Sequence, residues 1–335
     1  MFTRLHATDR PVIRERATSP RLSTHVPRLW ALWAASRPSQ LALIVLVYAL
    51  GVGMTTGGPS LVVGEPTANG FHEVSQTTFL TPVAVGAAVL VLVAVAVHYA
   101  NEYADADTDA LTEPTPFSGG SGALAETGLP ASFLGTATAV ASVVAALAGG
   151  TALFAGLLAF DAAALLGLIL VTGLAYSLQP VALARRGVGE VINASLGGLL
   201  LPVYGVAVVA APAVSAPLAV VPFTLVVGCN LLATHWPDRK ADATVGKDTL
   251  AVRWSPSRIR HAYATLACLA AVATAGLWLA GVFPTPVAVA HLVAAPFLAW
   301  GWTTLTRQRT PFPAVAAMVA LALASTAAWW WMGIG

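Results

Sequence analysis

Residues 81–109 read TPVAVGAAVLVLVAVAVHYANEYADADTD, an apolar run of about twenty residues that ends in a cluster of acids. A helix of about 20 apolar residues is long enough to cross the roughly 30 Å hydrocarbon layer of a bilayer. This stretch therefore predicts a transmembrane helix that carries polar side chains into water at one of its ends.

The whole chain shares the apolar character of this stretch. Of its 335 residues, 57% are hydrophobic and 10% are charged, and the mean hydropathy is +0.76. Soluble domains carry about 25% charged residues. We therefore predict an all-α integral membrane protein with no room for a soluble domain. The net charge of +2 indicates that nucleic acid is not a partner.

Nine apolar runs predict nine transmembrane helices. They cover residues 40–57, 78–100, 131–155, 159–177, 189–211, 216–236, 260–281, 284–304 and 312–333. With the N-terminus inside, all 17 Lys and Arg residues fall in the N-terminal tail or in the loops after spans four, six and eight. This positive-inside pattern predicts a cytoplasmic N-terminus in a multi-pass protein of the cell membrane.

The N-terminal segment is polar and rich in arginine, and it lacks the apolar core and cleavage site of a signal peptide. We predict a flexible, basic cytoplasmic tail over residues 1–36 and one transmembrane domain over residues 37–335. The 2 cysteines, Cys229 and Cys268, fall in predicted spans, so a disulfide framework is not expected.

Acidic residues gather in two predicted cytoplasmic loops. Asn101, Asp105 and Asp109 are spaced four apart after the second span, which places them on one face of a helix. Asp238 and Asp242 repeat this spacing after the sixth span. Mg²⁺ prefers such oxygen ligands and binds through a few carboxylates together with waters and substrate phosphates. The two clusters therefore predict Mg²⁺ ions bridged by a diphosphate.

Other readings of these residues stay open. Acids at helix ends often only mark the membrane boundary. Asp107 falls on the opposite side of the first cluster and is expected to be solvated, whereas Glu102 is expected to be structural. His98 and His235 each precede an acidic cluster by three residues, but packing or hydrogen bonding is a commoner role for them than metal ligation.

These clusters resemble the motifs of the UbiA superfamily of intramembrane prenyltransferases. The resemblance covers about residues 30–333. It is carried by NEYADADTD at 101–109, YSLQP at 176–180, RRGVGE at 185–190 and DRKADATVGKDTLAVR at 238–253. It implies nine transmembrane helices around a central cavity that opens to the cytoplasmic side, with the aspartate-rich motifs in cytoplasmic loops.

The resemblance also implies roles for single residues. The metal site and the catalytic aspartates would be formed by Asn101, Asp105, Asp109, Asp238 and Asp242. The prenyl diphosphate would contact Lys247, Arg253, Arg186 and Tyr176, and Arg185 could contact it in the same way as Arg186. Two alternatives stay open: the arginine pair only anchors the topology, and Tyr176 is an anchor at the membrane interface. Glu190 is expected to pair with a loop arginine. The loop after the first motif departs from the family pattern, because it has glycines at 119, 120 and 122 where many members have basic residues.

The implied reaction is loss of diphosphate from an allylic prenyl diphosphate, followed by capture of the allylic cation by an acceptor. Mg²⁺ would stabilise the charge on the leaving group, and the apolar helices would exclude water. The expected partners are a prenyl diphosphate, a small aromatic acceptor and membrane lipid.

The sequence GKDTLAVR at 246–253 is most similar to the branch of the family that prenylates 1,4-dihydroxy-2-naphthoate in menaquinone biosynthesis. The alternative enzyme transfers a geranylgeranyl group to a glycerol-phosphate ether lipid, and other aromatic acceptors remain open. From another class, a cation-coupled transporter is the rival, although its acids would be expected near the bilayer midplane.

Overall fold

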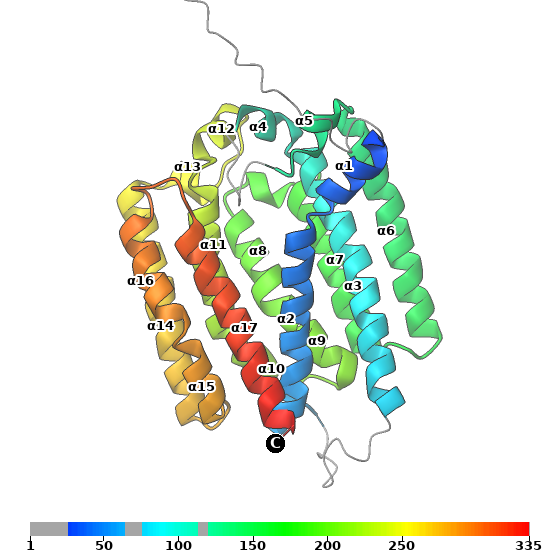
Figure 1. The fold of residues 1–335 in the computed structure, drawn as a ribbon, viewed down its shortest axis with the longest axis vertical. Coiled ribbons are helices and arrows are strands. Elements are labelled where there is room, and N and C mark those ends of the chain that lie inside the picture. The colour runs from blue at the N-terminus through cyan, green and yellow to red at the C-terminus, as the bar shows by residue number, and fades with distance from the viewer. Residues whose placement is uncertain (1–25, 64–75, 113–119, 335) are drawn as a thin grey trace, which may run out of the picture.

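The computed structural model describes residues 26–63, 76–112 and 120–334, so residues 1–25 of the predicted tail and the glycine at 119 lie outside the described residues (Figure 1). Within those ranges the chain forms helices and turns, with two isolated β-bridges and no strand. Eight helical segments are long and apolar enough to cross a membrane. The expected all-α fold is confirmed.

The eight segments follow the predicted runs closely. They are Pro27–Gly57 (α1, Pro27–Ala35, and α2, Pro38–Gly57), Phe79–Ala104 within α3 (Gln76–Ala104), α6 (Ala131–Phe154), α7 (Phe160–Ser177), Gly189–Val209 (α8, Gly189–Ala194; η5, Ser195–Leu200; α9, Leu201–Val209), α14 (Pro256–Leu279), Thr285–Thr304 (α15, Thr285–His291; α16, Ala294–Thr304) and Phe312–Gly333 within α17 (Phe312–Ile334).

The predicted span at 216–236 differs from the others. It contains α10 (Ser215–Ala219) and the apolar helix α11 (Val221–His235), which has 15 residues and is shorter than the other candidate spans. Pro222 stands in the first turn of α11, where its missing N–H removes no helical hydrogen bond. The described residues therefore show eight full-length spans and one shorter apolar helix, where the sequence predicted nine spans.

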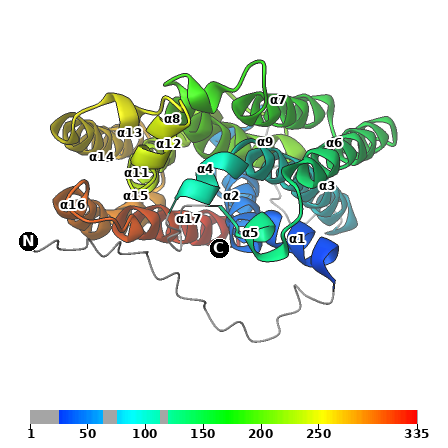
Figure 2. The same ribbon diagram turned by 90° about the horizontal axis from the view of Figure 1, so that it is seen from above.

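Short helices gather at one end of the bundle. Four of them lie between the long helices: α4 (Ala106–Leu111), α5 (Ala123–Thr127), α12 (Arg239–Thr244) and α13 (Leu250–Arg253). Figure 1 places all four at the same end as α1, and Figure 2 shows α4 and α12 side by side above the long helices, where they are in contact. The two loops with the acidic motifs therefore meet at one end of the fold.

The long helices that support this end approach one another closely. α2 packs against α9 at Gly51 and Gly205, where a Cβ on either glycine would overlap the backbone of the facing helix. Small residues permit such contacts between helices in a bilayer. The rings of Tyr48 and Tyr204 lie 5.6 Å apart beside this crossing, and both hydroxyls donate to carbonyl oxygens of α3. These contacts hold α2, α3 and α9 together in the first half of α3, at least 15 residues before the first acidic motif.

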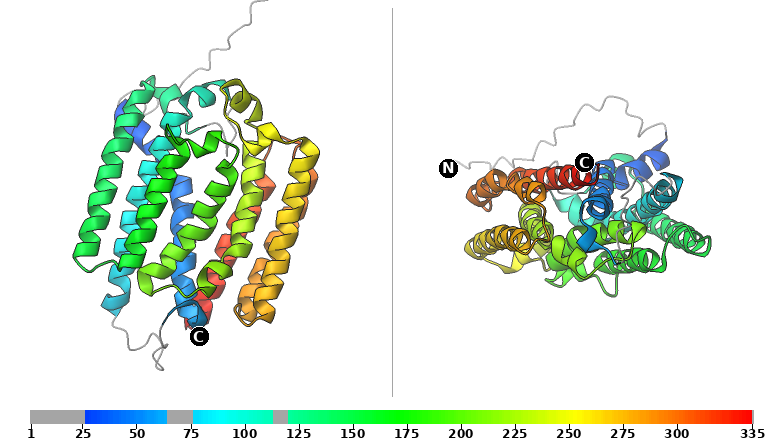
Figure 3. Two further views of the ribbon diagram at one scale, coloured as in Figure 1. Left: turned by 180° about the vertical axis from the view of Figure 1, so that it is seen from behind. Right: turned by 90° about the horizontal axis from the view of Figure 1, so that it is seen from below.

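The part of the predicted tail nearest the membrane is helical. α1 lies at the edge of this end of the bundle and packs against α3 and α5 (Figures 1 and 3). The hydroxyl of Tyr99 donates to the carbonyl of Leu32 at 3.0 Å, and Nδ1 of His98 lies 2.7 Å from the carbonyl oxygen of Ser36. His98 therefore hydrogen-bonds the chain at the start of α2.

Candidate active site

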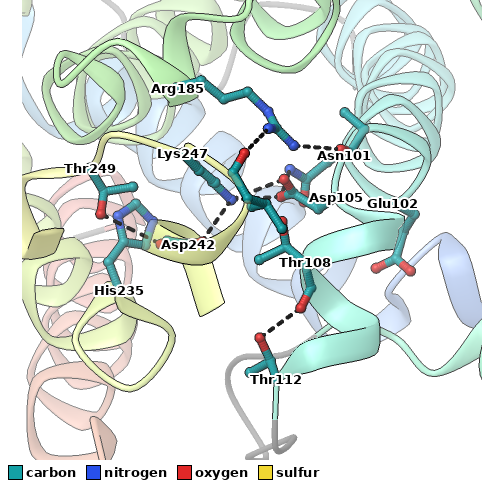
Figure 4. A network of polar contacts seen from close by, with 12 residues as sticks. Asn101, Glu102, Asp105, Thr108, Thr112, Arg185, His235, Asp242, Lys247 and Thr249 are labelled. Carbon is teal, nitrogen blue, oxygen red and sulfur yellow. Dashed lines mark hydrogen bonds and ion pairs between the residues drawn. The ribbon is translucent and has the colours of Figure 1, made fainter. Parts of the chain in front are cut away.

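The two acidic motifs converge on one ammonium group. Lys247 Nζ donates to both carboxylate oxygens of Asp105 at 3.0 Å and lies 3.7 Å from Asp242 Oδ1 (Figure 4). The side chains of Lys247 and Asp105 are 13% exposed, and that of Asp242 is 3% exposed. The motifs therefore face each other across a largely buried lysine.

The first motif keeps its helical spacing across a break in the helix. Asp105 stands between α3 and α4 as the residue that precedes α4. Its N–H donates to the carbonyl of Asn101 at 2.9 Å, and the N–H of Asp109 donates to the carbonyl of Asp105 at 2.8 Å. The Asn101 amide also donates to Asp105 Oδ2 at 3.0 Å. Asp107 is exposed, as the sequence predicted.

Asp109 lies in a crowded, negatively charged environment. Burial, reinforced by the charges of Asp105 and Glu102, raises the pKa of its carboxyl to about 7. The backbone of Gly120 packs against this carboxylate, because a Cβ at Gly120 would overlap Asp109 Oδ2, and the φ of Gly120 is 74°. The first motif therefore holds carboxyl groups close together at a site where a bound cation would lower their mutual repulsion.

The second motif and Lys247 belong to one turn. Asp238 precedes α12 and Asp242 lies in its first turn, with the N–H of Asp242 2.9 Å from the carbonyl of Asp238. The N–H of Lys247 donates to the carbonyl of Asp242 at 2.8 Å, so the chain after α12 folds back. Burial raises the pKa of Asp242, although the charge of Lys247 opposes that shift. Burial alone would lower the pKa of Lys247, but Asp105 and Asp242 raise it above its ordinary value.

The donor set at this site suits Mg²⁺. Within the described ranges, no group of three or more His, Cys, Asp or Glu residues is arranged to hold a metal ion without other ligands. Mg²⁺ does not need such a cage, because it binds through one or two carboxylates together with waters and phosphate oxygens. Asp105 and Asp242 offer carboxylates from two sides, and Asp242 Oδ1 accepts no hydrogen bond from the described residues. The residues present fit Mg²⁺ that is bound together with a phosphate group.

The three arginines of the site region differ in their contacts. Arg185, after α7, donates from Nη2 to the carbonyl of Ala104 at 3.1 Å and from Nη1 to that of Val245 at 3.3 Å. It therefore links the backbone next to Asp105 to the backbone between Asp242 and Lys247. Arg186 donates to the carbonyl of Pro180 at 2.6 Å. Arg185 therefore lies in the site, whereas Arg186 is exposed and contacts its own loop.

Arg253 also lies at the edge. Its Nε donates to Asp248 Oδ1 at 2.7 Å, and the two side chains are 46% and 43% exposed. Its Nη2 donates to the carbonyl of Arg186 at 3.3 Å. The structure therefore joins Arg253 to the Arg186 loop and brings neither arginine into contact with Asp105 or Asp242.

Tyr176 stands beside the converged motifs, near the end of α7. It interacts electrostatically with Lys247, Asp105 and Glu190, and its hydroxyl is hydrogen-bonded to the side chain of Asn193. The structure therefore brings this predicted residue to the site.

Glu102 has the structural role that the sequence predicted. Its side chain points away from Lys247 (Figure 4) and is 4% exposed. Oε1 accepts from Arg37 Nε at 2.7 Å and from the N–H of Ser121 at 3.0 Å, while Oε2 accepts from the hydroxyl of Ser121 at 2.6 Å. Glu102 therefore fastens the start of α2 and the segment after the first motif to the end of α3.

Glu190 was predicted to pair with a loop arginine, and that prediction is wrong. Its Oε1 lies 3.1 Å from Nδ1 of His235 and accepts from the N–H of Leu250 at 2.8 Å. The three residues come from α8, α11 and α13. Sequence spacing gave no signal for this cluster, because Glu190 and His235 are 45 positions apart.

A cavity of about 650 Å³ lies away from the two acidic motifs. It is bounded by α11, α14, α15 and α16 and is lined mainly by apolar side chains such as Ala267 and Ala271, with no residue of either acidic motif. The central cavity that the family resemblance implies stays a prediction.

A family model described as the UbiA prenyltransferase family matches residues 67–326. No curated protein sequence matches the chain. The fold is similar to that of a UbiA homolog from Archaeoglobus fulgidus bound to GPP and Mg²⁺, with a TM-score of 0.66, 15% identity, and coverage of 91% of this chain and 100% of that chain.

Two further solved structures share the fold. One is described as a digeranylgeranylglyceryl phosphate synthase, with a TM-score of 0.59, 11% identity, and coverage of 90% of this chain and 99% of that chain. The other is the apo form of a UbiA homolog from Aeropyrum pernix K1, with a TM-score of 0.58, 15% identity, and coverage of 85% and 95%. At these identities the likeness shows a common architecture.

Proposed function

The chain belongs to the UbiA prenyltransferase family. We propose that it transfers a prenyl group from a prenyl diphosphate to a small aromatic acceptor, or alternatively to a glycerol-phosphate ether lipid, in a reaction that requires Mg²⁺. The observation that carries this proposal is the position of Lys247, which lies between the carboxylates of Asp105 and Asp242. This arrangement suits a metal–diphosphate complex. The carboxylates at the two helix ends can bind the metal ion, and the buried ammonium can bind the phosphate oxygens.

The acidic motifs bind the metal in this proposal. The ligands are drawn from Asn101, Asp105, Asp109, Asp238 and Asp242. When bound, Mg²⁺ supplies positive charge that stabilises the diphosphate as it leaves. The Lys247 ammonium, which lies between the carboxylates of Asp105 and Asp242, would contact the phosphate oxygens. In this proposal the Arg185 guanidinium and the Tyr176 hydroxyl help to orient the same group, while Arg186 and Arg253 act from the edge of the site.

The membrane-spanning helices accommodate the isoprenoid chain and exclude water from the cation. We count α10 and α11 together as the ninth span. The described Lys and Arg residues lie at the end of the bundle that carries the two motifs, which supports a cytoplasmic N-terminus and a site that opens to the cytoplasm.

For the acceptor we propose 1,4-dihydroxy-2-naphthoate, which would place the enzyme in menaquinone biosynthesis. The support is the sequence at 246–253, which supplies Lys247 to the site. A glycerol-phosphate ether lipid is the alternative acceptor to be tested beside it.

The test uses purified protein in lipid with geranylgeranyl diphosphate and Mg²⁺. One reaction receives 1,4-dihydroxy-2-naphthoate and another receives geranylgeranylglyceryl phosphate, each with an Asp105→Ala control. A prenylated naphthoquinol that disappears with EDTA and in the variant supports both the acceptor and the metal role. Product from the glycerol lipid alone moves the enzyme to ether-lipid synthesis. A protein that binds no prenyl diphosphate would overturn the proposal.

A further inference from the structure

We infer that Glu190 is the binding site for the hydroxyl group of the acceptor, and that its Oε2 accepts first the hydrogen bond and then the proton of that hydroxyl. This inference rests on the proposed function, because it concerns the second substrate of the same reaction. Both candidate acceptors carry a hydroxyl at the reacting position: in the dihydroxynaphthoate it lies on the carbon next to the one that is prenylated, and in the glycerol-phosphate lipid its oxygen is the atom that is prenylated.

The inference begins from a contrast between two buried glutamates. Glu102 and Glu190 are both 4% exposed. Both carboxylate oxygens of Glu102 accept hydrogen bonds, from Arg37 and Ser121. Glu190 Oε2 is buried and accepts none from the described residues. Buried carboxylate oxygens are nearly always hydrogen-bonded, because removing them from water without a new donor costs free energy. We therefore expect a ligand to supply the donor to Glu190 Oε2.

The other oxygen of Glu190 is held firmly. The N–H of Leu250 and Nδ1 of His235 both contact Oε1, at 2.8 Å and 3.1 Å. A carboxylate only accepts, so the His235 nitrogen that faces it carries the hydrogen. Donors from two helices therefore fix the plane of the carboxylate and leave Oε2 as its open acceptor. His235 is a positioning residue in this arrangement.

The Glu190 carboxylate is also linked to the residues of the proposed diphosphate site. Leu250 follows Lys247 by three residues, and the intervening Thr249 donates to Asp242 Oδ2 at 3.5 Å. Tyr176 interacts electrostatically with Glu190 and also with Lys247 and Asp105. A hydroxyl on Glu190 would thus lie beside the diphosphate site, which is where the acceptor must meet C1 of the prenyl group.

The proton transfer balances for either acceptor. The C1–O bond of the prenyl diphosphate breaks and its electron pair leaves with the diphosphate. With the dihydroxynaphthoate, the ring carbon forms a bond to C1, the hydroxyl proton moves to Glu190 Oε2 and the ring oxygen becomes a carbonyl. The carboxylate, now β to that carbonyl, leaves as CO₂, and the resulting enolate takes the proton back. With the glycerol lipid, the hydroxyl oxygen bonds to C1 and Glu190 later passes the proton to water.

The decisive variant is Glu190→Gln. Glutamine keeps the shape and can still accept from Leu250 through its carbonyl oxygen, but it cannot take a proton. We expect turnover to fall about 100-fold or more, as for loss of a general base, while the Kd of geranylgeranyl diphosphate with Mg²⁺ stays within about threefold. Glu190→Asp should recover part of the turnover, because it restores the carboxylate.

A second measurement uses the acceptor with its hydroxyl methylated, whichever acceptor is active. The wild-type protein should bind the hydroxylated form about tenfold or more tightly than the methyl ether, corresponding to one hydrogen bond to a charged group. Glu190→Gln should bind the two forms alike. Glu102→Gln is the matched control, since it alters an equally buried glutamate: it should lower the melting temperature but keep the wild-type preference for the hydroxyl.

The outcomes separate this inference from the proposed function. Wild-type activity that survives in Glu190→Gln, or a hydroxyl preference unchanged in that variant, overturns the acceptor site and leaves the prenyltransferase standing. Weakened diphosphate binding in Glu190→Gln, with the hydroxyl preference intact, assigns Glu190 to the diphosphate side and likewise overturns it. A wild-type protein that binds no prenyl diphosphate shows that the proposed function itself has failed.

Discussion

Lys247 Nζ lies 3.0 Å from both carboxylate oxygens of Asp105, although the two residues are 142 positions apart in the chain. This contact joins the loop after α3 to the loop after α12, and Asp242 lies on the other side of the same ammonium at 3.7 Å. A lysine that compensates two largely buried carboxylates is charged, and its pKa lies above its ordinary value. The charge of each motif is therefore compensated by a lysine that it shares with the other motif.

Replacing Lys247 with Met should reduce turnover by about 100-fold or more, because one charged donor to the leaving diphosphate is lost. The apolar side chain has a similar length, so the change removes charge more than volume. Steady-state kinetics with geranylgeranyl diphosphate measure the effect. Lys247→Arg, which keeps the charge, should lose less. Turnover within threefold of wild type in Lys247→Met would show that the ammonium only joins the two loops.

Asp105→Asn and Asp242→Asn should each abolish most of the activity. The activity of the double variant should be only slightly lower than that of the less active single variant. Residues that hold one metal–substrate complex act as a unit, so their effects are not additive. EDTA should inactivate the wild-type protein and added Mg²⁺ should restore it. Losses that multiply in the double variant would place the two aspartates in independent sites.

The sequence predicts most of the helices because the length of an apolar span is set by the thickness of the bilayer, which is a local requirement. The run at 131–155, for example, became α6, Ala131–Phe154. The contact between Asn101 and Asp105 is also predictable from local sequence, because residues four positions apart on a helix lie next to each other.

The rest of the site depends on how distant helices pack. Arg185 reaches the carbonyl of Ala104 across 81 positions, and Glu190 reaches His235 across 45. No periodicity within a single segment distinguishes Arg185 in the site from Arg186 at its edge, because the two residues are adjacent and differ only in the contacts that the fold provides. The same limit applies to Glu190, for which the sequence predicts a loop arginine as partner and the fold provides His235.

Gly120→Ala should raise the Mg²⁺ concentration needed for half-maximal activity. The new Cβ would overlap the Asp109 carboxylate and displace it from the first motif. Gly128→Ala is the matched control, since its φ of 68° imposes a similar backbone cost of about 1 kcal/mol, while a Cβ there meets no atom within 4 Å. Activity titrated with Mg²⁺ distinguishes the two. Equal shifts in both variants would mean that backbone strain, and not displacement of Asp109, causes the change.

The ion pair between Arg37 and Glu102 should be a strong stabilising contact of the α1–α3 end. Arg37 is 20% exposed and Glu102 4%, so removing one partner leaves the other charge partly or wholly buried. We expect Arg37→Gln and Glu102→Gln each to lower the free energy of unfolding by about 3 kcal/mol. The double variant should lose less than the sum, because the second change removes a charge that is already unpaired. Thermal unfolding in lipid or detergent measures all three variants. Additive losses would show that Ser121, which donates to both oxygens of Glu102, and not Arg37, stabilises this carboxylate.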